Sequence, residues 1–374
     1  MKKRLFISIA ALTLSALLCT AGCNQGGTDS SSVSSVSEVS PVSDESAEES
    51  SEASEEETKS IQEPFDEELD KINYSGVVYA TKGGEVVAVY SKGQSETGVS
   101  FSVDTPMPVG SVSKQFCAAA ILHLRDQGKL STDDTLAKYF PEYTQASEVT
   151  LKQVLSMRGG IPDIDENIYS VVSNDNTEEQ NDTGLQKWLF SKPLDFEPDS
   201  GFGYSNAGYY LLALIVEQVS GQKYIDYIRE NFFVPLGMEN TFSVTEMVLS
   251  EEAAKGIKYE HVDRQPGITD GAGDIISTGE DMTKWLRGLA GGKVISAESY
   301  EEMTTDYTPG EGYGYGIRTR FFGGIGHPGQ IGDYFSADLI IPKKDITLFF
   351  SSNTINLGDL NSLLTKLPAI LRRS

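Results

Sequence analysis

PVGSVSKQF, at residues 108–116, leads from a glycine turn straight into an apolar segment, and the interpretation of the chain starts from it. Ser111 and Lys114 stand three residues apart, so they share one face of the first turn of the helix predicted there. A serine hydroxyl needs a nearby base at neutral pH, and a lysine whose pKa is lowered can act as one. The pair suggests a serine acyl-transfer site, although the same spacing also occurs by chance, with the serine as a helix cap.

Length and charge narrow the classes of function. A chain of 374 residues is long enough for one large or two ordinary domains. Its formal charge of −25 argues against a nucleic-acid partner, since such binding needs clustered lysine and arginine. The histidines His123, His261 and His327 lie far apart in the sequence and form no ligand-spaced motif. We therefore expect no metal and no other cofactor.

The first 23 residues have the pattern of a secretory address. Three basic residues precede an apolar run over residues 5–18, and small residues lead up to Cys23. This pattern resembles a bacterial lipoprotein signal peptide, in which the cysteine is lipidated and becomes the first mature residue, although Thr20 replaces the more usual aliphatic residue. We expect lipid on Cys23 to anchor the protein at the extracytoplasmic face of the cell membrane. The alternative is an ordinary cleaved secretory signal with an incidental cysteine.

Residues 24–63 are rich in serine and glutamate and have no hydrophobic periodicity. Such a segment cannot bury enough apolar surface to offset the entropy lost on ordering, so we expect a disordered acidic tether. The folded domain is then expected over residues 64–374. If Cys23 carries lipid, Cys117 is the one remaining free thiol, and no intramolecular disulfide can form.

The folded region begins and ends with strand patterns and has helical patterns between them. Two β-rich runs at 75–80 and 85–90, separated by glycines, predict a hairpin. The helix after Ser111 is apolar on nearly every side and ends at Gly128, which indicates a buried central position in which Cys117 packs and His123 is structural. Further elements are expected as an exposed loop at 165–185, helices at 151–157, 209–219, 224–233 and 357–371, and strands at 312–318, 323–326, 334–341 and 346–351.

This order predicts an α+β fold. Strands from both ends of the domain should form one antiparallel β-sheet flanked by helices. The middle of the chain, from about residue 130 to 265, should form an inserted, mostly helical lobe.

Two further motifs follow Ser111 and Lys114 in the chain: Tyr204-Ser205-Asn206 before an apolar helix, and His327-Pro328-Gly329 beside a predicted strand. Ser-x-x-Lys, Tyr-x-Asn and His-x-Gly in this order resemble the motifs of the penicillin-recognising serine hydrolases. The most similar branch contains class C β-lactamases, D-alanyl-D-alanine carboxypeptidases and family VIII esterases. The resemblance covers residues 64–374 and implies a β-lactamase/transpeptidase-like fold, with the site in the groove between sheet and helical lobe.

The resemblance implies a role for each motif residue. Ser111 would be the acylated nucleophile, and Lys114 and Tyr204 would handle its proton; the sequence leaves open which of the two is the base. Asn206 would hydrogen-bond the substrate and hold Lys114, and His327 would face Tyr204 or the leaving group.

The same resemblance predicts how the oxyanion is bound. Backbone N–H groups of Ser111 and Gln330 would form the oxyanion hole. Gly329 would let the substrate approach the backbone closely.

The third motif departs from the family pattern in two places. Many relatives have lysine where this chain has His327, and many carboxypeptidases have threonine where it has Pro328, which lacks both a hydroxyl and a backbone N–H. Both changes weaken the recognition of a carboxylate. The expected substrate is therefore a cell-wall D-amino-acid peptide or a small ester or amide, with weak β-lactamase activity at most.

Two other interpretations remain open. In an α/β-hydrolase, Ser205 of Gly203-Tyr204-Ser205-Asn206-Ala207 would be the nucleophile, although Ala207 replaces the expected glycine. Alternatively, the domain is a non-catalytic peptidoglycan-binding or regulatory module of the same fold. The glycine-containing segment 271–274 is interpreted as a loop on the groove wall and not as a phosphate loop.

Overall fold

A computed structural model describes residues 61–249 and 267–373. The expected signal peptide with Cys23, the expected tether up to residue 60, and His261 lie outside the described residues. Helix α1 begins at Gln62, so the folded region starts two residues before the predicted boundary at residue 64.

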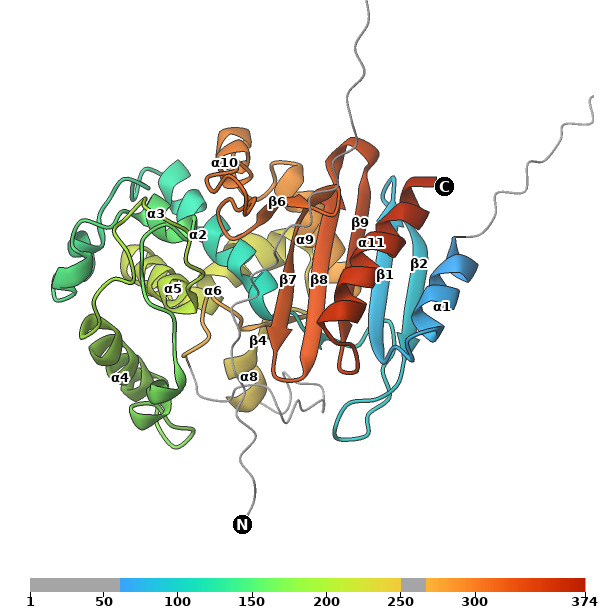
Figure 1. The fold of residues 1–374 in the computed structure, drawn as a ribbon, viewed down its shortest axis with the longest axis horizontal. Coiled ribbons are helices and arrows are strands. Elements are labelled where there is room, and N and C mark those ends of the chain that lie inside the picture. The colour runs from blue at the N-terminus through green and yellow to red at the C-terminus, as the bar shows by residue number, and fades with distance from the viewer. Residues whose placement is uncertain (1–60, 250–266, 374) are drawn as a thin grey trace, which may run out of the picture.

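The centre of the domain is a six-stranded antiparallel sheet with the strand order β2-β1-β9-β8-β7-β6 (Figure 1). The strands are β1 (Gly76–Lys82), β2 (Glu85–Lys92), β6 (Arg318–Phe321), β7 (Gly324–Ile331), β8 (Tyr334–Ile341) and β9 (Ile346–Ser352). The last strand, β9, lies beside the first, β1, with Val78 opposite Phe350. One sheet is thus built from both ends of the domain, which confirms the predicted α+β fold and the hairpin of β1 and β2.

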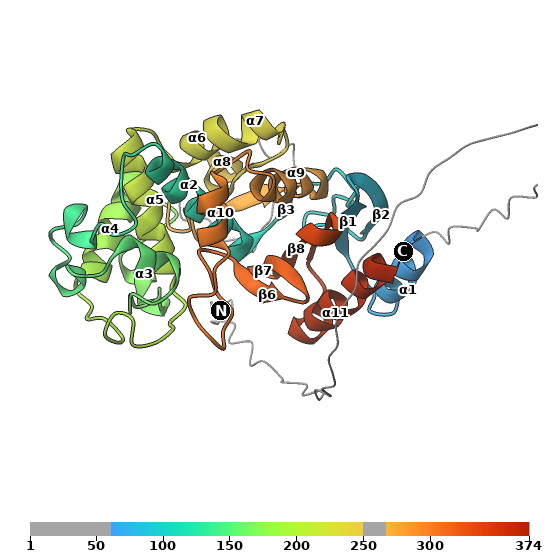
Figure 2. The same cartoon turned by 90° about the horizontal axis from the view of Figure 1, so that it is seen from above.

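Helices cover both faces of this sheet. Figure 2 shows α1 (Gln62–Asp70) and α11 (Leu357–Arg373) on one side, and α2 (Lys114–Asp126) and α9 (Gly279–Ala290) on the other. Successive side chains of a strand point to opposite faces, so Phe349 contributes to the core beneath α2 and α9, and Phe350 to the core beneath α1 and α11. The sheet is buried between two apolar cores.

The middle of the chain forms the helical lobe beside the sheet (Figure 1). Its elements are α3 (Leu151–Leu155), α4 (Glu178–Phe190), α5 (Asn206–Ser220), α6 (Tyr224–Ile228), a π-helical turn (Arg229–Phe233), α7 (Val234–Leu236) and the 3₁₀ turns η2 (Leu136–Lys138), η3 (Thr144–Ala146) and η4 (Glu166–Ser170). Helix α2 is buried along almost its whole length and packs against α5. Ten of its thirteen residues are buried, so the prediction of a central apolar helix is confirmed.

Short elements join the sheet to the lobe. They are β3 (Met107–Pro108), β4 (Phe242–Ser243), β5 (Ile275–Ser277), α8 (Val244–Leu249), α10 (Ala297–Met303) and the 3₁₀ turn η1 (Gly110–Ser113). Another 3₁₀ turn, η6 (Pro342–Lys344), connects β8 to β9 within the large sheet. The three short strands form a second sheet in the order β3-β5-β4. Strand β4 lies inside the region predicted to be helical. Its two residues are too few to produce an alternating pattern, so the strand could not be predicted from the sequence.

Two sequence predictions are wrong in detail. Residues 165–185 are not one loop, because α4 starts at Glu178 after a capping box of Thr177 and Gln180 and buries Leu185. The predicted strand 312–318 is largely irregular, and β6 begins only at its last residue. Gly312 and Gly316 both have left-handed φ angles, +65° and +66°, which break an extended run.

Within residues 61–249 and 267–373, no helix combines the length and the apolar character that crossing a bilayer requires.

Candidate active site

Ser111 lies in the turn η1, one turn before α2, and Lys114 is the first residue of that helix. The two side chains meet as their spacing predicts: Lys114 Nζ lies 3.3 Å from Ser111 Oγ. Ser111 is partly exposed, whereas Lys114 is completely buried. A hydroxyl that solvent can reach therefore stands next to an amine that is shielded from solvent.

Three oxygen atoms surround the Lys114 amine. Besides Ser111, Nζ donates to Asn206 Oδ1 at 2.7 Å and to the backbone carbonyl of Ala272 at 2.6 Å. Burial lowers the pKa of Lys114 from 10.5 to about 7, and the carboxylates of Asp163 and Asp274 oppose this shift in part. At neutral pH a substantial fraction of Lys114 is thus uncharged and able to accept a proton.

Tyr204 faces the same amine. Lys114 Nζ lies 4.8 Å from the centre of its ring. The phenol oxygen is buried and has no hydrogen bond within ordinary geometry among the described residues. Burial raises the pKa of Tyr204 above its usual value of 10, while the neighbouring Ser111 hydroxyl opposes the rise. Tyr204 is therefore a protonated phenol that is free to donate to a ligand.

Asn206 begins α5 and is buried between Lys114 and a carboxylate absent from the sequence prediction, that of Asp163. Its Oδ1 accepts from Lys114, and its Nδ2 donates to Asp163 Oδ2 at 3.1 Å. The Asn206 backbone N–H donates to Asp163 Oδ1 at 2.7 Å. One of the two Nδ2 hydrogens of Asn206 is thus used in the hydrogen bond to Asp163. The substrate contact predicted for Asn206 would have to use the second Nδ2 hydrogen.

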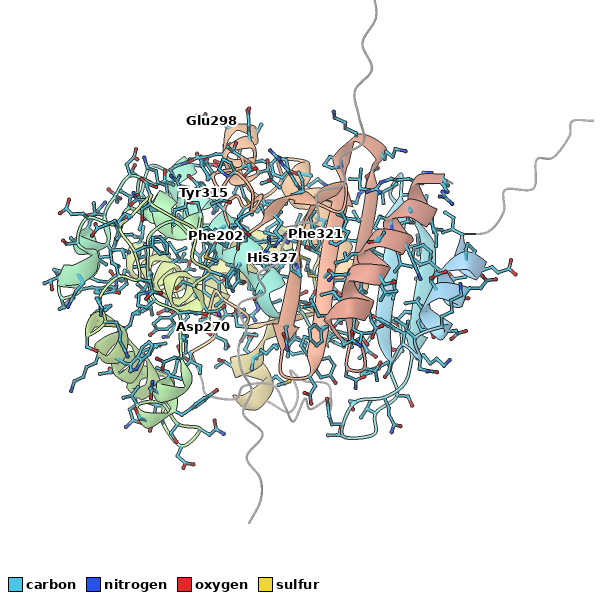
Figure 3. The ribbon with its side chains drawn as sticks, in the orientation of Figure 1. Phe202, Asp270, Glu298, Tyr315, Phe321 and His327 are labelled. Atoms are coloured by element: carbon cyan, nitrogen blue, oxygen red, sulfur yellow. The ribbon has the colours of Figure 1, made fainter. Side chains whose placement is uncertain are left out.

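His327 lies on β7 at the border between the sheet and the helical lobe, as Figure 3 shows. Its ring centre is 6.2 Å from that of Tyr204, but its Nε2 hydrogen-bonds the hydroxyl of Tyr313 at 3.1 Å. Burial, with the nearby cations Arg318 and Lys114, lowers the pKa of His327 well below 6.5. His327 is therefore neutral and 2 % exposed, so it supplies no fixed positive charge.

Close backbone packing brings η1 against β7. A Cβ atom on Gly329 would lie 2.1 Å from the carbonyl oxygen of Val109, and one on Gly110 would lie 2.8 Å from the backbone nitrogen of Gln330. Gly110 also has a left-handed φ of +51°. The two glycines thus allow the turn that carries Ser111 to approach the strand that carries Gln330. An oxyanion hole made of the backbone N–H groups of Ser111 and Gln330 requires this close approach.

Sequence reasoning did not identify three neighbours of the motif residues: Asp163, Ala272 and Tyr313. Asp163 directly follows Pro162 in the irregular segment between α3 and η4, and no sequence pattern distinguishes it there. Ala272 acts through its backbone carbonyl, for which side-chain identity gives no signal. Its hydrogen bond places the loop 271–274 directly against the Lys114 amine.

The other residues weighed from the sequence have structural roles. Ser205 is 3 % exposed and caps α5, its Oγ accepting from the Gly208 N–H at 2.9 Å. Together with the antiparallel sheet, this rules out the α/β-hydrolase interpretation. Cys117 is buried in the core, and His123 hydrogen-bonds the Tyr227 hydroxyl at 2.8 Å. Among the described residues, no cluster of three or more histidine, cysteine, aspartate or glutamate side chains could hold a metal ion.

Two solved structures share this architecture. D-amino acid amidase from Ochrobactrum anthropi SV3 is 25% identical, with a TM-score of 0.67, and the match covers 84% of this chain and 98% of the amidase. The octameric penicillin-binding protein homologue from Pyrococcus abyssi is 27% identical, with a TM-score of 0.66, and the match covers 84% of this chain and 76% of the homologue.

Sequence comparison points the same way. PbpX of Bacillus subtilis (strain 168), named for penicillin binding, is 31% identical over 257 residues, which are 67% of this chain and 62% of PbpX. The chain spans less than two thirds of the length of the curated relatives that it matches most strongly. The family model described as Beta-lactamase matches residues 63–363, so the chain belongs to that family.

Proposed function

We propose that this protein is a serine acyl hydrolase that works through an acyl-enzyme on Ser111. The observation that carries the proposal is the Lys114 amine, which is fully buried, has a pKa of about 7 and lies 3.3 Å from the Ser111 hydroxyl. A buried amine near neutrality is a base matched to activating a hydroxyl at physiological pH.

The proposed reaction has two halves. In the first, Ser111 Oγ bonds to the substrate carbonyl carbon, its proton passes to Lys114, and the carbon's bond to the leaving nitrogen or oxygen breaks as that atom is protonated. Tyr204, a buried phenol above Lys114, is placed to relay this proton. In the second half, water attacks the ester and restores the Ser111 hydroxyl. The N–H groups of Ser111 and Gln330 stabilise the oxyanion in both halves.

The proposed substrates are cell-wall D-amino-acid peptides or small esters and amides. The similarity to a D-amino acid amidase and to penicillin-binding proteins supports an acyl group of this class. The neutral His327 and the missing hydroxyl at Pro328 favour substrates whose binding does not depend on a strong carboxylate contact. For the same reason we propose that β-lactams acylate Ser111 but turn over slowly.

Substrate profiling tests the proposal. Wild-type protein and Ser111→Ala are compared on a D-Ala-D-Ala peptide, a D-amino acid amide, a p-nitrophenyl ester and a chromogenic cephalosporin. We expect wild-type turnover of at least one amide or ester, slow cephalosporin hydrolysis, and no turnover by Ser111→Ala. Failure of wild-type protein to hydrolyse any of the four, while it binds peptidoglycan, would support the non-catalytic binding module instead.

We also propose that Cys23 is lipidated and holds the domain at the outer face of the cell membrane. The support is the sequence pattern of residues 1–23. Full-length protein expressed in a bacterium should partition into the detergent phase of a phase-separating detergent, and Cys23→Ser should partition into water. Equal partitioning of both would argue for an ordinary secreted form.

A further inference from the structure

The Asp163 carboxylate stands at the start of helix α5 and accepts hydrogen bonds from N–H groups on both of its oxygens. Oδ1 accepts from the backbone N–H groups of Ile164 at 2.8 Å and Asn206 at 2.7 Å, and Oδ2 accepts from Asn206 Nδ2 at 3.1 Å. A group that accepts from several donors at a helix N-terminus is stabilised in its ionised form. Burial raises the pKa of Asp163, while these N–H donors and the charge of Lys114 oppose that rise. The three hydrogen bonds fix the partly buried carboxyl group in one orientation.

This arrangement determines which way the Asn206 amide points. An asparagine amide has an acceptor end and a donor end, and its neighbours decide their placement. Asp163 accepts from the Nδ2 end, so the Oδ1 end must face Lys114, whose amine donates to it at 2.7 Å. Without the carboxylate, a turned amide would place Nδ2 against the amine, donor against donor.

We propose that Asp163 is a positioning residue of this site: its carboxylate orients the Asn206 amide, and through that amide and its own charge it holds the Lys114 amine beside Ser111. The inference deepens the proposed function and rests on it. Asp163 touches no reacting atom in this arrangement and acts only through Asn206 and its electric field.

The electrostatics agree with this geometry. Asp163 is the largest of the contributions that raise the pKa of Lys114 against the effect of burial. The other titratable groups that face Lys114 or share its surroundings are Asp274, Cys117, Tyr204, Tyr209 and His327. Tyr204 and Tyr209 are protonated at neutral pH, as is the Cys117 thiol, and His327 is neutral. Asp274 is buried with a pKa raised to about 7, so its charge is lost as the pH falls below neutrality.

Asp163→Asn is the main test variant. It removes the charge while keeping the size of the side chain and its ability to cap a helix. Asp163→Glu keeps the charge and serves as the conservative rescue. Asp165→Asn is the matched control, because Asp165 is an exposed carboxylate two residues away that caps the turn η4 and lies 4.0 Å from the Lys192 amine. Thermal unfolding checks that each variant is folded, and Asp163→Ser, which also caps helices without charge, replaces Asp163→Asn if that variant does not fold.

Two readouts are measured on the full-length protein. The first is the pKa of Lys114, followed by NMR of protein labelled with ¹³C at the lysine ε-carbon and assigned by the signal missing in Lys114→Met. The second is the rate at which a p-nitrophenyl ester acylates Ser111, measured from pH 5 to 9.

We expect Asp163→Asn to lower the pKa of Lys114 by about one unit, since an anion that stabilised the ammonium is gone. The midpoint of the acylation profile should move to lower pH by the same amount, and its plateau should fall about tenfold to a hundredfold because the amine is misplaced. Asp163→Glu should restore most of both, and Asp165→Asn should change neither.

An unchanged Lys114 pKa in folded Asp163→Asn would overturn the proposal, as would a loss of rate without any shift of the midpoint. The NMR titration needs no turnover, so it decides whether Asp163 controls Lys114 even if wild-type protein is not acylated. Lack of wild-type acylation counts against the proposed function alone.

Discussion

Two opposing effects of its surroundings determine the pKa of the Lys114 amine. Complete burial favours the neutral amine, while the oxygens of Asn206 and Ala272 and the charge of Asp163 favour the ammonium. The balance leaves its pKa at about 7, low enough for the neutral amine to be populated at neutral pH and high enough for that amine to bind a proton.

The pH dependence of acylation tests this balance. The neutral fraction of Lys114 increases as pH rises through 7, so kcat/KM for an ester should rise about tenfold per pH unit below 7 and level off above about 8. Lys114→Arg, whose guanidinium stays protonated, should lose acylation at every pH from 5 to 9. A wild-type rate that is flat across this range would show that Lys114 is not the base.

At the scale of elements, the fit of η1 against β7 is expected to set the oxyanion hole. Gly110→Ala would place a methyl group 2.8 Å from the Gln330 backbone nitrogen, so acylation should fall about a hundredfold. Gly128→Ala is the matched control, because its φ is also left-handed, +71°, but nothing lies within 4 Å of its Cβ position. Both variants should lose about 1 kcal/mol of stability to backbone strain. Equal acylation rates in Gly110→Ala and Gly128→Ala would show that the oxyanion hole does not depend on the close contact between η1 and β7.

The start of α5 provides a second test at this scale. Ser205→Ala removes the side-chain cap that accepts from the Gly208 N–H, so thermal or denaturant unfolding should show a loss of about 1 kcal/mol. Because the proposed nucleophile is Ser111, esterase activity measured well below the melting temperature should remain within about twofold of wild type. Loss of activity in a folded Ser205→Ala variant would contradict this prediction and would indicate Ser205 as the nucleophile.

The elements that sequence predicted correctly are those with strong periodic patterns. Helix α2 and strands β8 and β9 were predicted because each buries side chains along nearly its whole length. The hairpin of β1 and β2 was predicted from two β-rich runs separated by glycines, although β2 is largely exposed or half-buried. Residues 312–317 failed because alternating glycine and tyrosine imitates a strand, although left-handed glycines break it. Asp163 and Ala272 could not be predicted as neighbours of Lys114. Asp163 is linked to Lys114 by hydrogen bonds only through the Asn206 amide, and Ala272 contributes only its backbone carbonyl.

At the scale of the whole molecule, the sheet lies between two apolar cores. The core beneath α2 and α9 lies on the side of the candidate site, and the core beneath α1 and α11 lies on the opposite side. Leu364 is 1 % exposed in the core between α11 and the sheet, and Leu357 is an exposed residue of the same helix. Leu364→Ala should lower the free energy of unfolding by about 2–5 kcal/mol, and Leu357→Ala by less than about 0.5 kcal/mol. Denaturant titrations measure both. The acylation midpoint near pH 7 should be the same in the two variants, and a shifted midpoint in folded Leu364→Ala would show that the cores are coupled.

The central claim is that Ser111 becomes acylated, and intact-protein mass spectrometry with peptide mapping tests it most directly. Wild-type protein, Ser111→Ala and Ser205→Ala are each incubated with a penicillin, a p-nitrophenyl ester and a fluorophosphonate. We predict one adduct on wild type and on Ser205→Ala, mapped to Ser111, and none on Ser111→Ala. An adduct that maps to Ser205, or wild-type protein that remains unmodified by all three reagents, would contradict the account.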